Sequence, residues 1–271
     1  MKKNRKYSVI VIGGGHAGVE AACSAARVGV SVALVTHKID KIGEMSCNPA
    51  IGGLGKGHLV REIDALDGVM GRAIDQSGIQ FRMLNRSKGP AVHGPRSQAD
   101  RSLYKKSVQE ILLNQQKIRV VEGFVDDLII DNQEIKGVVL NNGKKFFCSS
   151  LIITTGTFLG GKIFVGNETF EAGRVGDKSS SKLSQKIRNL GFPVGRLKTG
   201  TPPRLVKNTI DWNLIELQPA DKNPVPFSYL TSKIEVSQIQ CGITRTTEKT
   251  HNIIEKNLKK SPVFSGSIKG Y

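Results

Sequence analysis

The sequence is short of the features that mark membrane and secreted proteins. No apolar run approaches the roughly 18 to 20 residues that a membrane-spanning helix needs, so we expect no membrane association. The basic start Met-Lys-Lys-Asn-Arg-Lys leads into an apolar run that breaks at Gly13, which is too short for a secretory signal. We therefore expect a cytoplasmic protein.

Cysteine and metal-binding patterns are also scarce. The four cysteines include no Cys-x-x-Cys pair, and the five histidines form no His-Glu-x-x-His motif. The spacing predicts neither disulfides nor a metal site. We expect Cys23 to lie in a helix core. Cys47, in a Ser-Cys-Asn-Pro turn near Lys56, is either a small residue in a tight loop or an activated nucleophile.

Acidic residues are few relative to basic ones. The 271 residues hold 23 Asp and Glu against 40 Lys and Arg, for a net charge of +17. This excess indicates a polyanionic partner such as RNA or DNA, although a compositional drift toward lysine would produce it too. The basic residues recur along the chain, which is typical of a folded basic face rather than a tail.

What the sequence does contain is a glycine motif between two predicted strands. Tyr7 to Ile12 and Ser31 to Val35 are predicted as buried parallel strands, with a helix over Ala17 to Val28 that Gly29 ends. The intervening Gly13-Gly14-Gly15-His16-Ala17-Gly18 matches Gly-x-Gly-x-x-Gly, whose glycines make a tight turn, admit a pyrophosphate and let helix and strand pack closely. We predict a Rossmann-like, doubly wound α/β fold with a dinucleotide at the helix N-terminus.

One feature of that motif is missing. The acidic residue that usually follows the second strand and holds a ribose hydroxyl is replaced by Thr36-His37-Lys38. We expect Thr36 to form the hydrogen bond to the adenosine ribose instead.

Further elements follow from periodicity and turn chemistry. We expect a long glycine-bearing loop over Ile39 to Gly57 and a mixed, mostly loop segment over Gly78 to Arg96. Asp64, Asp67 and Asp75 could orient a proton transfer, but acids at such positions are more often on a helix surface, and we interpret them so. The predicted helices and strands beyond the motif are a helix with an apolar face at Leu59, Val60, Ile63 and Leu66, helices over Ala99 to Leu113 and Lys182 to Leu190, and strands over 119–122, 125–130, 135–140 and 151–154, with a hairpin turn at Asn142-Gly143.

Two groups of cations accompany glycine-rich loops. One surrounds the loops between residues 52 and 101, and the other lies in Arg196-Leu197-Lys198-Thr199-Gly200-Thr201-Pro202-Pro203-Arg204. Taken singly, each cation is more simply a solvated surface charge, but together they suit phosphate groups. The residues we assign to nucleic acid are Lys56, Arg96, Lys198 and Arg204.

An ordered series of motifs resembles one known family. The matching stretches are Gly-Gly-Gly-His-Ala-Gly at Gly13, Met-Ser-Cys-Asn-Pro-Ala-Ile-Gly-Gly at Met45, Gly-Lys-Gly-His-Leu-Val at Gly55, Gly-Ile-Gln-Phe-Arg at Gly78, Lys-Gly-Pro-Ala-Val at Lys88, Gln-Ala-Asp-Arg at Gln98, Gly-Thr-Phe-Leu at Gly156, Gly-Arg-Leu-Lys-Thr-Gly-Thr-Pro-Pro-Arg at Gly195 and Glu-Lys-Thr-His at Glu248. In order and spacing they resemble the MnmG (GidA) family of tRNA uridine 5-carboxymethylaminomethyl modification enzymes.

The resemblance implies an activity, cofactors and partners. Members are FAD enzymes that act with the GTPase MnmE on C5 of the wobble uridine of tRNA. They use methylenetetrahydrofolate and an amine, with the flavin reduced by NADH, and form a homodimer that joins MnmE in a heterotetramer. By the match, Gly13 to Gly18 bind FAD phosphates, Val125 and Ser180 are further FAD contacts, and Cys47 is a candidate catalytic cysteine.

The resemblance also implies a domain organisation. Family chains are much longer, so we expect this one to be the N-terminal portion, truncated before the NAD site and with little activity alone. A composition shift near Thr199 predicts an FAD-binding domain over 1–200 and an incomplete inserted domain over 201–271. Two other functions stay open: a generic FAD/NAD oxidoreductase of a small molecule, and an inactive RNA-binding remnant.

Overall fold

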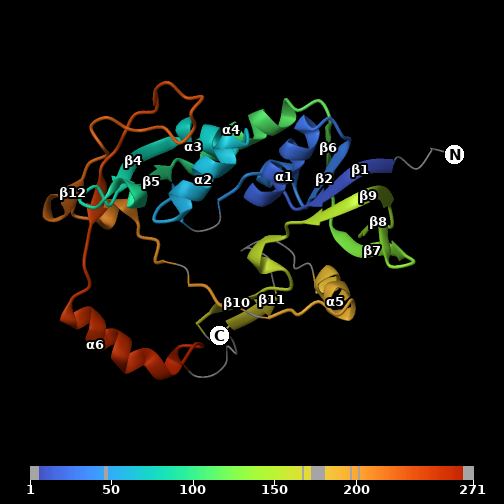
Figure 1. Ribbon diagram of the computed structural model, residues 1–271. Helices are drawn as coiled ribbons and strands as arrows, with labels where there is room; N and C mark the ends of the chain where they lie inside the picture. Colours follow the sequence, from blue (N-terminus) through green and yellow to red (C-terminus); the bar gives the residue numbers. More distant parts are fainter. Residues whose placement is uncertain are drawn as a thin grey trace. The chain divides into compact units, whose positions relative to one another are not determined.

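The structure is a computed structural model that describes residues 6–45, 48–166, 168–171, 181–195, 197–200 and 202–264 (Figure 1). The helices are α1 (His16–Arg27), α2 (Lys56–Ala65), α3 (Met70–Asp75), α4 (Arg101–Leu113), α5 (Ser181–Asn189) and α6 (Glu248–Asn257). The strands are β1 (Lys6–Ile12), β2 (Val32–Thr36), β3 (Ala50–Gly52), β4 (Gly78–Leu84), β5 (Gly94–Ala99), β6 (Ile118–Glu122), β7 (Val125–Asp131), β8 (Glu134–Leu140), β9 (Lys145–Ile153), β10 (Lys162–Val165), β11 (Glu168–Glu171), β12 (Glu216–Gln218) and β13 (Cys241–Ile243).

Six strands within residues 6–153 form a sheet of order β6-β2-β1-β9-β8-β7 (Figure 1). β6, β2, β1 and β9 are parallel, whereas β8 pairs antiparallel with both β7 and β9. The chain leaves β1 toward β2 on one side, and β9 returns on the other side. The carboxyl end of β1 is therefore the topological switch point, where open parallel sheets bind their ligands.

The central strands are apolar because they are buried on both faces. Every residue of β2 is buried, and Ile10 and Val11 of β1 are fully buried. Small residues let α1 pack closely on this sheet, because Ala22, Cys23 and Ala26 all lie in its buried stripe. The predicted strand–turn–helix–strand unit and the core position of Cys23 are confirmed.

A second, antiparallel sheet of order β3-β5-β4 lies where the sequence analysis expected loops. The expectation of a mostly loop segment over Gly78 to Arg96 is wrong, since β4 and β5 occupy most of it. The many polar and basic residues of this segment do not show the apolar alternation that predicts a strand. Phe81 and Ser97 are nevertheless buried. The expected apolar face of α2 is also wrong, because Leu59 and Leu66 are exposed and only Val60 of that set is buried.

Two acids assigned to helix surfaces are instead buried anchors for a distant segment. Residues 219–240 return to the β4 side of this sheet, where the Asp221 N–H donates to the Phe81 carbonyl at 2.9 Å. The Asp75 carboxylate accepts from the N–H groups of Phe227 and Ser228 at 2.8 and 2.9 Å. Asp64 accepts from the Tyr229 N–H at 3.0 Å. Of the three acids, Asp67 alone is exposed, beside Arg27 and Arg72.

The hydrogen bonds to the buried acids hold the backbone that carries a buried aromatic side chain, Phe227. Phe227 is 1% exposed and packs on Phe81, with ring centroids 6.3 Å apart. A Cβ on Gly52 would lie 2.7 Å from the Phe227 ring, so the buried position of this ring requires glycine at residue 52. Burying this ring contributes on the order of 2 kcal/mol, and the carboxylate bonds determine where it enters.

The chain divides into two compact units, residues 1–156 with 219–240, and residues 157–218 with 241–271. The second unit contains α5 and α6 and the antiparallel pairs β10–β11 and β12–β13. The boundary predicted near residue 200 falls inside this second unit, and the assignment of 1–200 and 201–271 as domains stays a prediction. Within the residues that the structure describes, no helix is long and apolar enough to cross a membrane.

Replacing Asp75 by Asn should destabilise the fold. Each carboxylate oxygen accepts one backbone N–H, and an amide would turn its NH₂ toward one of those donors. We expect a loss of about 1–3 kcal/mol in the free energy of unfolding at pH 7, measured by urea denaturation. The exposed Glu62→Gln on α2 is the matched control and should stay within about 0.5 kcal/mol of wild type. Equal stability of D75N and wild type would contradict the anchoring role.

The same carboxyl should give the stability a pH dependence. Burial raises the pKa of Asp75 above its usual 3.8, so the folded state holds the proton more tightly than the unfolded state. The stabilisation of the folded state that comes from this tighter proton binding is complete below the usual pKa of the carboxyl. It is lost as the pH rises through the raised pKa of the folded state. The stability difference between wild type and D75N should therefore narrow with rising pH across the acidic range.

Candidate functional site

The Gly-x-Gly-x-x-Gly turn joins the end of β1 to the start of α1 at the switch point. Gly13 has φ +112°, a left-handed conformation that favours glycine. A Cβ on Gly18 would lie 1.8 Å from the Gly13 carbonyl oxygen, and one on Gly13 would lie 2.3 Å from the Thr154 carbonyl oxygen. The first and third glycines therefore let strand, helix and the end of β9 approach one another, as predicted.

The second glycine faces open space. A Cβ on Gly15 would meet no atom within 4 Å, although its φ of −78° would accept other residues. Gly15 is the N-cap of α1 and offers no side-chain cap, and the first turn carries no acid. The helix N-terminus thus presents N–H groups and a partial positive charge to a space that glycine keeps clear, an arrangement that fits a pyrophosphate.

The other residues of the motif have distinct surroundings. Gly14 lies against β2, because its Cβ would be 2.8 Å from the Thr36 hydroxyl oxygen. Ala17 is exposed on the first turn of α1. The His16 ring lies 5.5 Å from the buried Tyr104 ring of α4, so this side chain packs against α4.

A carboxylate lies beside the position where the sequence lacks one. Thr36 is 7% exposed and pairs in register with Glu122 at the end of β6. Glu122 Oε2 accepts from the Ile39 N–H at 3.0 Å, so it holds the loop that follows β2. The sequence analysis missed this residue, because only strand order brings β6 next to β2.

An aromatic stack and a buried valine complete this end of the sheet. The His37 ring stacks on Phe124 with centroids 4.0 Å apart, and the adjacent Val125 is 4% exposed at the start of β7. Thr36, predicted to meet an adenosine ribose, lies on β2 beside the edge strand β6, and Val125, implied as an FAD contact, begins β7 directly after the turn that follows β6.

The four residues assigned to nucleic acid divide between the two units. Lys56 begins α2, and a Cβ on the following Gly57 would lie 2.4 Å from the carbonyl oxygen of Pro95, which precedes Arg96. The structure thus brings the segments carrying Lys56 and Arg96 together. Lys198 and Arg204 are exposed in the second unit.

Cys47 and Ser180, the candidate catalytic residue and one implied FAD contact, lie outside the described residues. The segments that flank Cys47 are bound to β5 and α4: the Arg101 guanidinium donates to the Met45 carbonyl, and the Ala99 N–H donates to the Pro49 carbonyl at 2.7 Å. Burial raises the pKa of Cys23 to about 11, and burial also raises that of Cys148, so both thiols stay neutral near pH 7.

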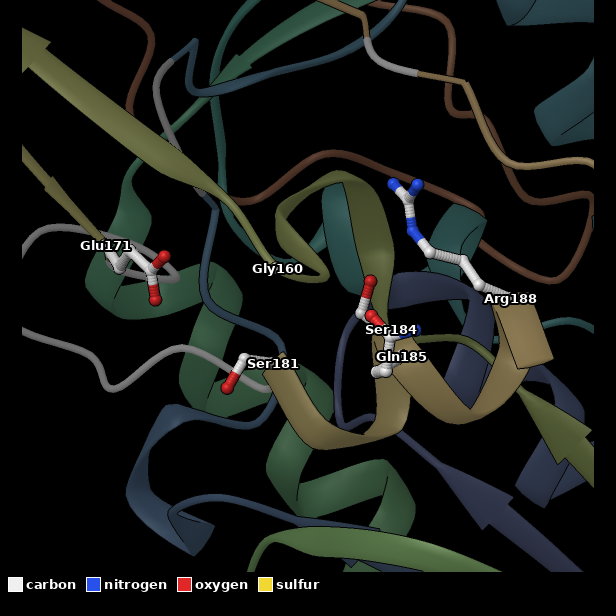
Figure 2. A pocket seen from close by; sticks show the side chains of 6 residues that line it. All are labelled: Gly160, Glu171, Ser181, Ser184, Gln185 and Arg188. Atoms are coloured by element: carbon white, nitrogen blue, oxygen red, sulfur yellow. The ribbon is translucent and has the colours of Figure 1, made fainter.

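A polar pocket lies within the second unit. Figure 2 shows Ser181, Ser184, Gln185 and Arg188 of α5 beside the Gly160 turn, with Glu171 at the end of β11. A Cβ on Gly160, which has φ +62°, would lie 3.0 Å from the Ser184 hydroxyl oxygen. Hydroxyl, amide and guanidinium groups of this kind suit a polar ligand group.

Known proteins match this chain along nearly all of its length. The model of the family described as "Glucose inhibited division protein A" matches residues 8–271. This chain belongs to the GidA family. The tRNA uridine 5-carboxymethylaminomethyl modification enzyme MnmG of Granulibacter bethesdensis is 55% identical over 267 residues, 97% of this chain and 42% of its own length. The chain thus spans less than half of that GidA relative.

Solved GidA structures agree with the fold. Aquifex aeolicus GidA superposes with a TM-score of 0.93 in one crystal form, at 46% identity over 98% of this chain and 45% of its own. A second crystal form gives a TM-score of 0.90 at 47% identity over 93% and 43%. A GidA-related protein from Thermus thermophilus shares the fold at 22% identity, with a TM-score of 0.52 over 70% of this chain and 71% of its own. The predicted family and the Rossmann-like α/β class are confirmed.

Two substitutions in the turn should distinguish an effect on ligand binding from an effect on folding, one at Gly15, which faces open space, and one at Gly18, which contacts backbone. Gly15→Val places its side chain in open space, so we expect the melting temperature of flavin-free wild type but loss of bound flavin absorbance. Gly18→Ala is the matched control, because its Cβ would collide with the Gly13 carbonyl and should lower the melting temperature itself. Flavin retained by G15V would contradict a pyrophosphate at this turn.

Proposed function

We propose that this chain forms the FAD-binding portion of an enzyme that modifies C5 of the wobble uridine of tRNA. The N–H groups of Gly15 to Gly18 would hold the pyrophosphate, and the residues around Thr36 and Val125 would hold the adenosine end. The observation that carries the proposal is the clear space at Gly15 in front of the α1 N-terminus, in a chain 55% identical to an MnmG.

Within this proposal, bound FAD supplies the redox chemistry, and the chain binds and orients the reactants. Cys47 would be the nucleophile toward uridine, since its turn is glycine-rich and close in sequence to the cation Lys56. The Arg101 and Ala99 contacts would hold the flanks of that turn. Ser180 would add a further FAD contact.

The proposed partners follow from charge and family. We infer that tRNA binds through Lys56, Arg96, Lys198 and Arg204, because a net charge of +17 favours a phosphate backbone. A one-carbon unit from methylenetetrahydrofolate, electrons from NADH bound outside these residues, the GTPase MnmE, a homodimer and a cytoplasmic location complete the proposal.

Two measurements distinguish this function from its rivals. The purified protein should show flavin absorbance, which an RNA-binding remnant would lack. It should also bind tRNA with an affinity that falls steeply as the salt concentration rises, which a small-molecule oxidoreductase would not do. A colourless protein that cannot be reconstituted with FAD would refute the proposal.

Changing Lys198 and Arg204 together to Ala should weaken tRNA binding more than flavin binding. Both side chains are exposed and belong to the second unit, whereas the glycine turn belongs to the first. Removing two phosphate contacts should lower the slope of log affinity against log salt by about 2. The exposed pair Lys249 and Lys256 on α6 provides a charge-matched control. Equal losses of tRNA and flavin would assign the loop to the cofactor.

A further inference from the structure

An exposed tyrosine is held on a fixed backbone beside the second sheet. Tyr229 is 76% exposed, yet its N–H is bound by the buried Asp64 and the two preceding N–H groups by the buried Asp75. The neighbouring Phe227 is buried in the core. The Tyr229 ring is thus exposed to solvent on a backbone that hydrogen bonds hold in place. A ligand that binds to this ring would therefore cost little conformational entropy of the protein.

An arginine is held beside this ring. The guanidinium carbon of Arg61 lies 5.7 Å from the Tyr229 ring centroid, within the range of a cation–π contact. Arg61 Nη2 also donates to the Pro226 carbonyl at 3.2 Å, so the same loop fixes both side chains. The pair places a planar cation beside a ring that remains largely open to solvent.

We infer that Tyr229 and Arg61 form a stacking platform for an unpaired RNA base, an inference that rests on the proposed function. Proteins recognise unpaired bases by stacking them on aromatic rings and guanidinium planes. The cation beside the ring also attracts the phosphate that accompanies each base. The chain's charge of +17 favours a polyanion over an apolar protein surface, and the open aromatic face favours RNA among polyanions because its bases stack, although the next residue, Leu230, is exposed as well.

The test measures binding of a labelled tRNA anticodon stem–loop by fluorescence anisotropy over a series of salt concentrations. Tyr229→Ala should weaken binding about tenfold without changing the salt slope, because it removes a ring and no charge. Tyr229→Phe keeps the ring and should bind within about twofold of wild type. Arg61→Ala should weaken binding and lower the slope by about 1. Leu230→Ala, at 73% exposure, is the matched control and should bind like wild type.

The outcomes separate this inference from the function on which it rests. If wild type binds the stem–loop and Y229A binds equally well, the platform is wrong and the proposed function stands. If wild type binds no RNA, the proposed function itself fails. If Y229A has a lowered melting temperature or loses flavin, the ring contributes to the fold, and the stacking platform is wrong. Unchanged RNA binding with loss of a protein partner would assign the surface to protein docking.

Discussion

The close approach of backbone segments at the end of β1 is the constraint on which the rest of the structure depends. Three chain segments meet there, namely the turn at Gly13, the first turn of α1 and the end of β9 at Thr154. Thr154 donates both its N–H and its hydroxyl to the Ile12 carbonyl, each at 2.8 Å. No side chain fits between these segments, so glycine is required, and the helix N-terminus is aimed at the edge of the sheet.

Buried carboxylates, in addition to apolar packing, hold distant segments of the chain in place. Asp64 and Asp75 satisfy backbone N–H groups that would otherwise be buried without partners, and in doing so they place Phe227 in the core and Tyr229 at the surface. Glu20 acts in the same way on α3, accepting from the N–H groups of Val69 and Met70. Glu20 thereby links α1, which packs on the first sheet, to α3.

The sequence predicted best where local and long-range preferences agree. The strand–turn–helix–strand unit was predicted because β-branched runs, small helical residues and glycine spacing all indicate one structure. The Asn142-Gly143 hairpin was predicted for the same reason, and Gly143 has φ +77°. Helix α4 was predicted within two residues at its start, where Asp100 caps Ser102 and Leu103. Prediction failed at β4 and β5, whose basic and polar residues give no clear apolar alternation, and where β4 also bonds to the distant segment 219–240.

The sequence by itself determined the fold class, the family and the glycine turn, since each depends on residues that are neighbours along the chain or follow a fixed spacing. The tertiary structure alone decided which acids are buried, which strand supplies a carboxylate beside Thr36, and that Tyr229 meets Arg61. These pairs are separated by up to 168 positions (229 − 61), and no local preference brings them together. The contacts of Tyr229 with Arg61 and Asp64 form only when the burial of Phe227 offsets the entropy lost as segment 219–240 returns to the second sheet.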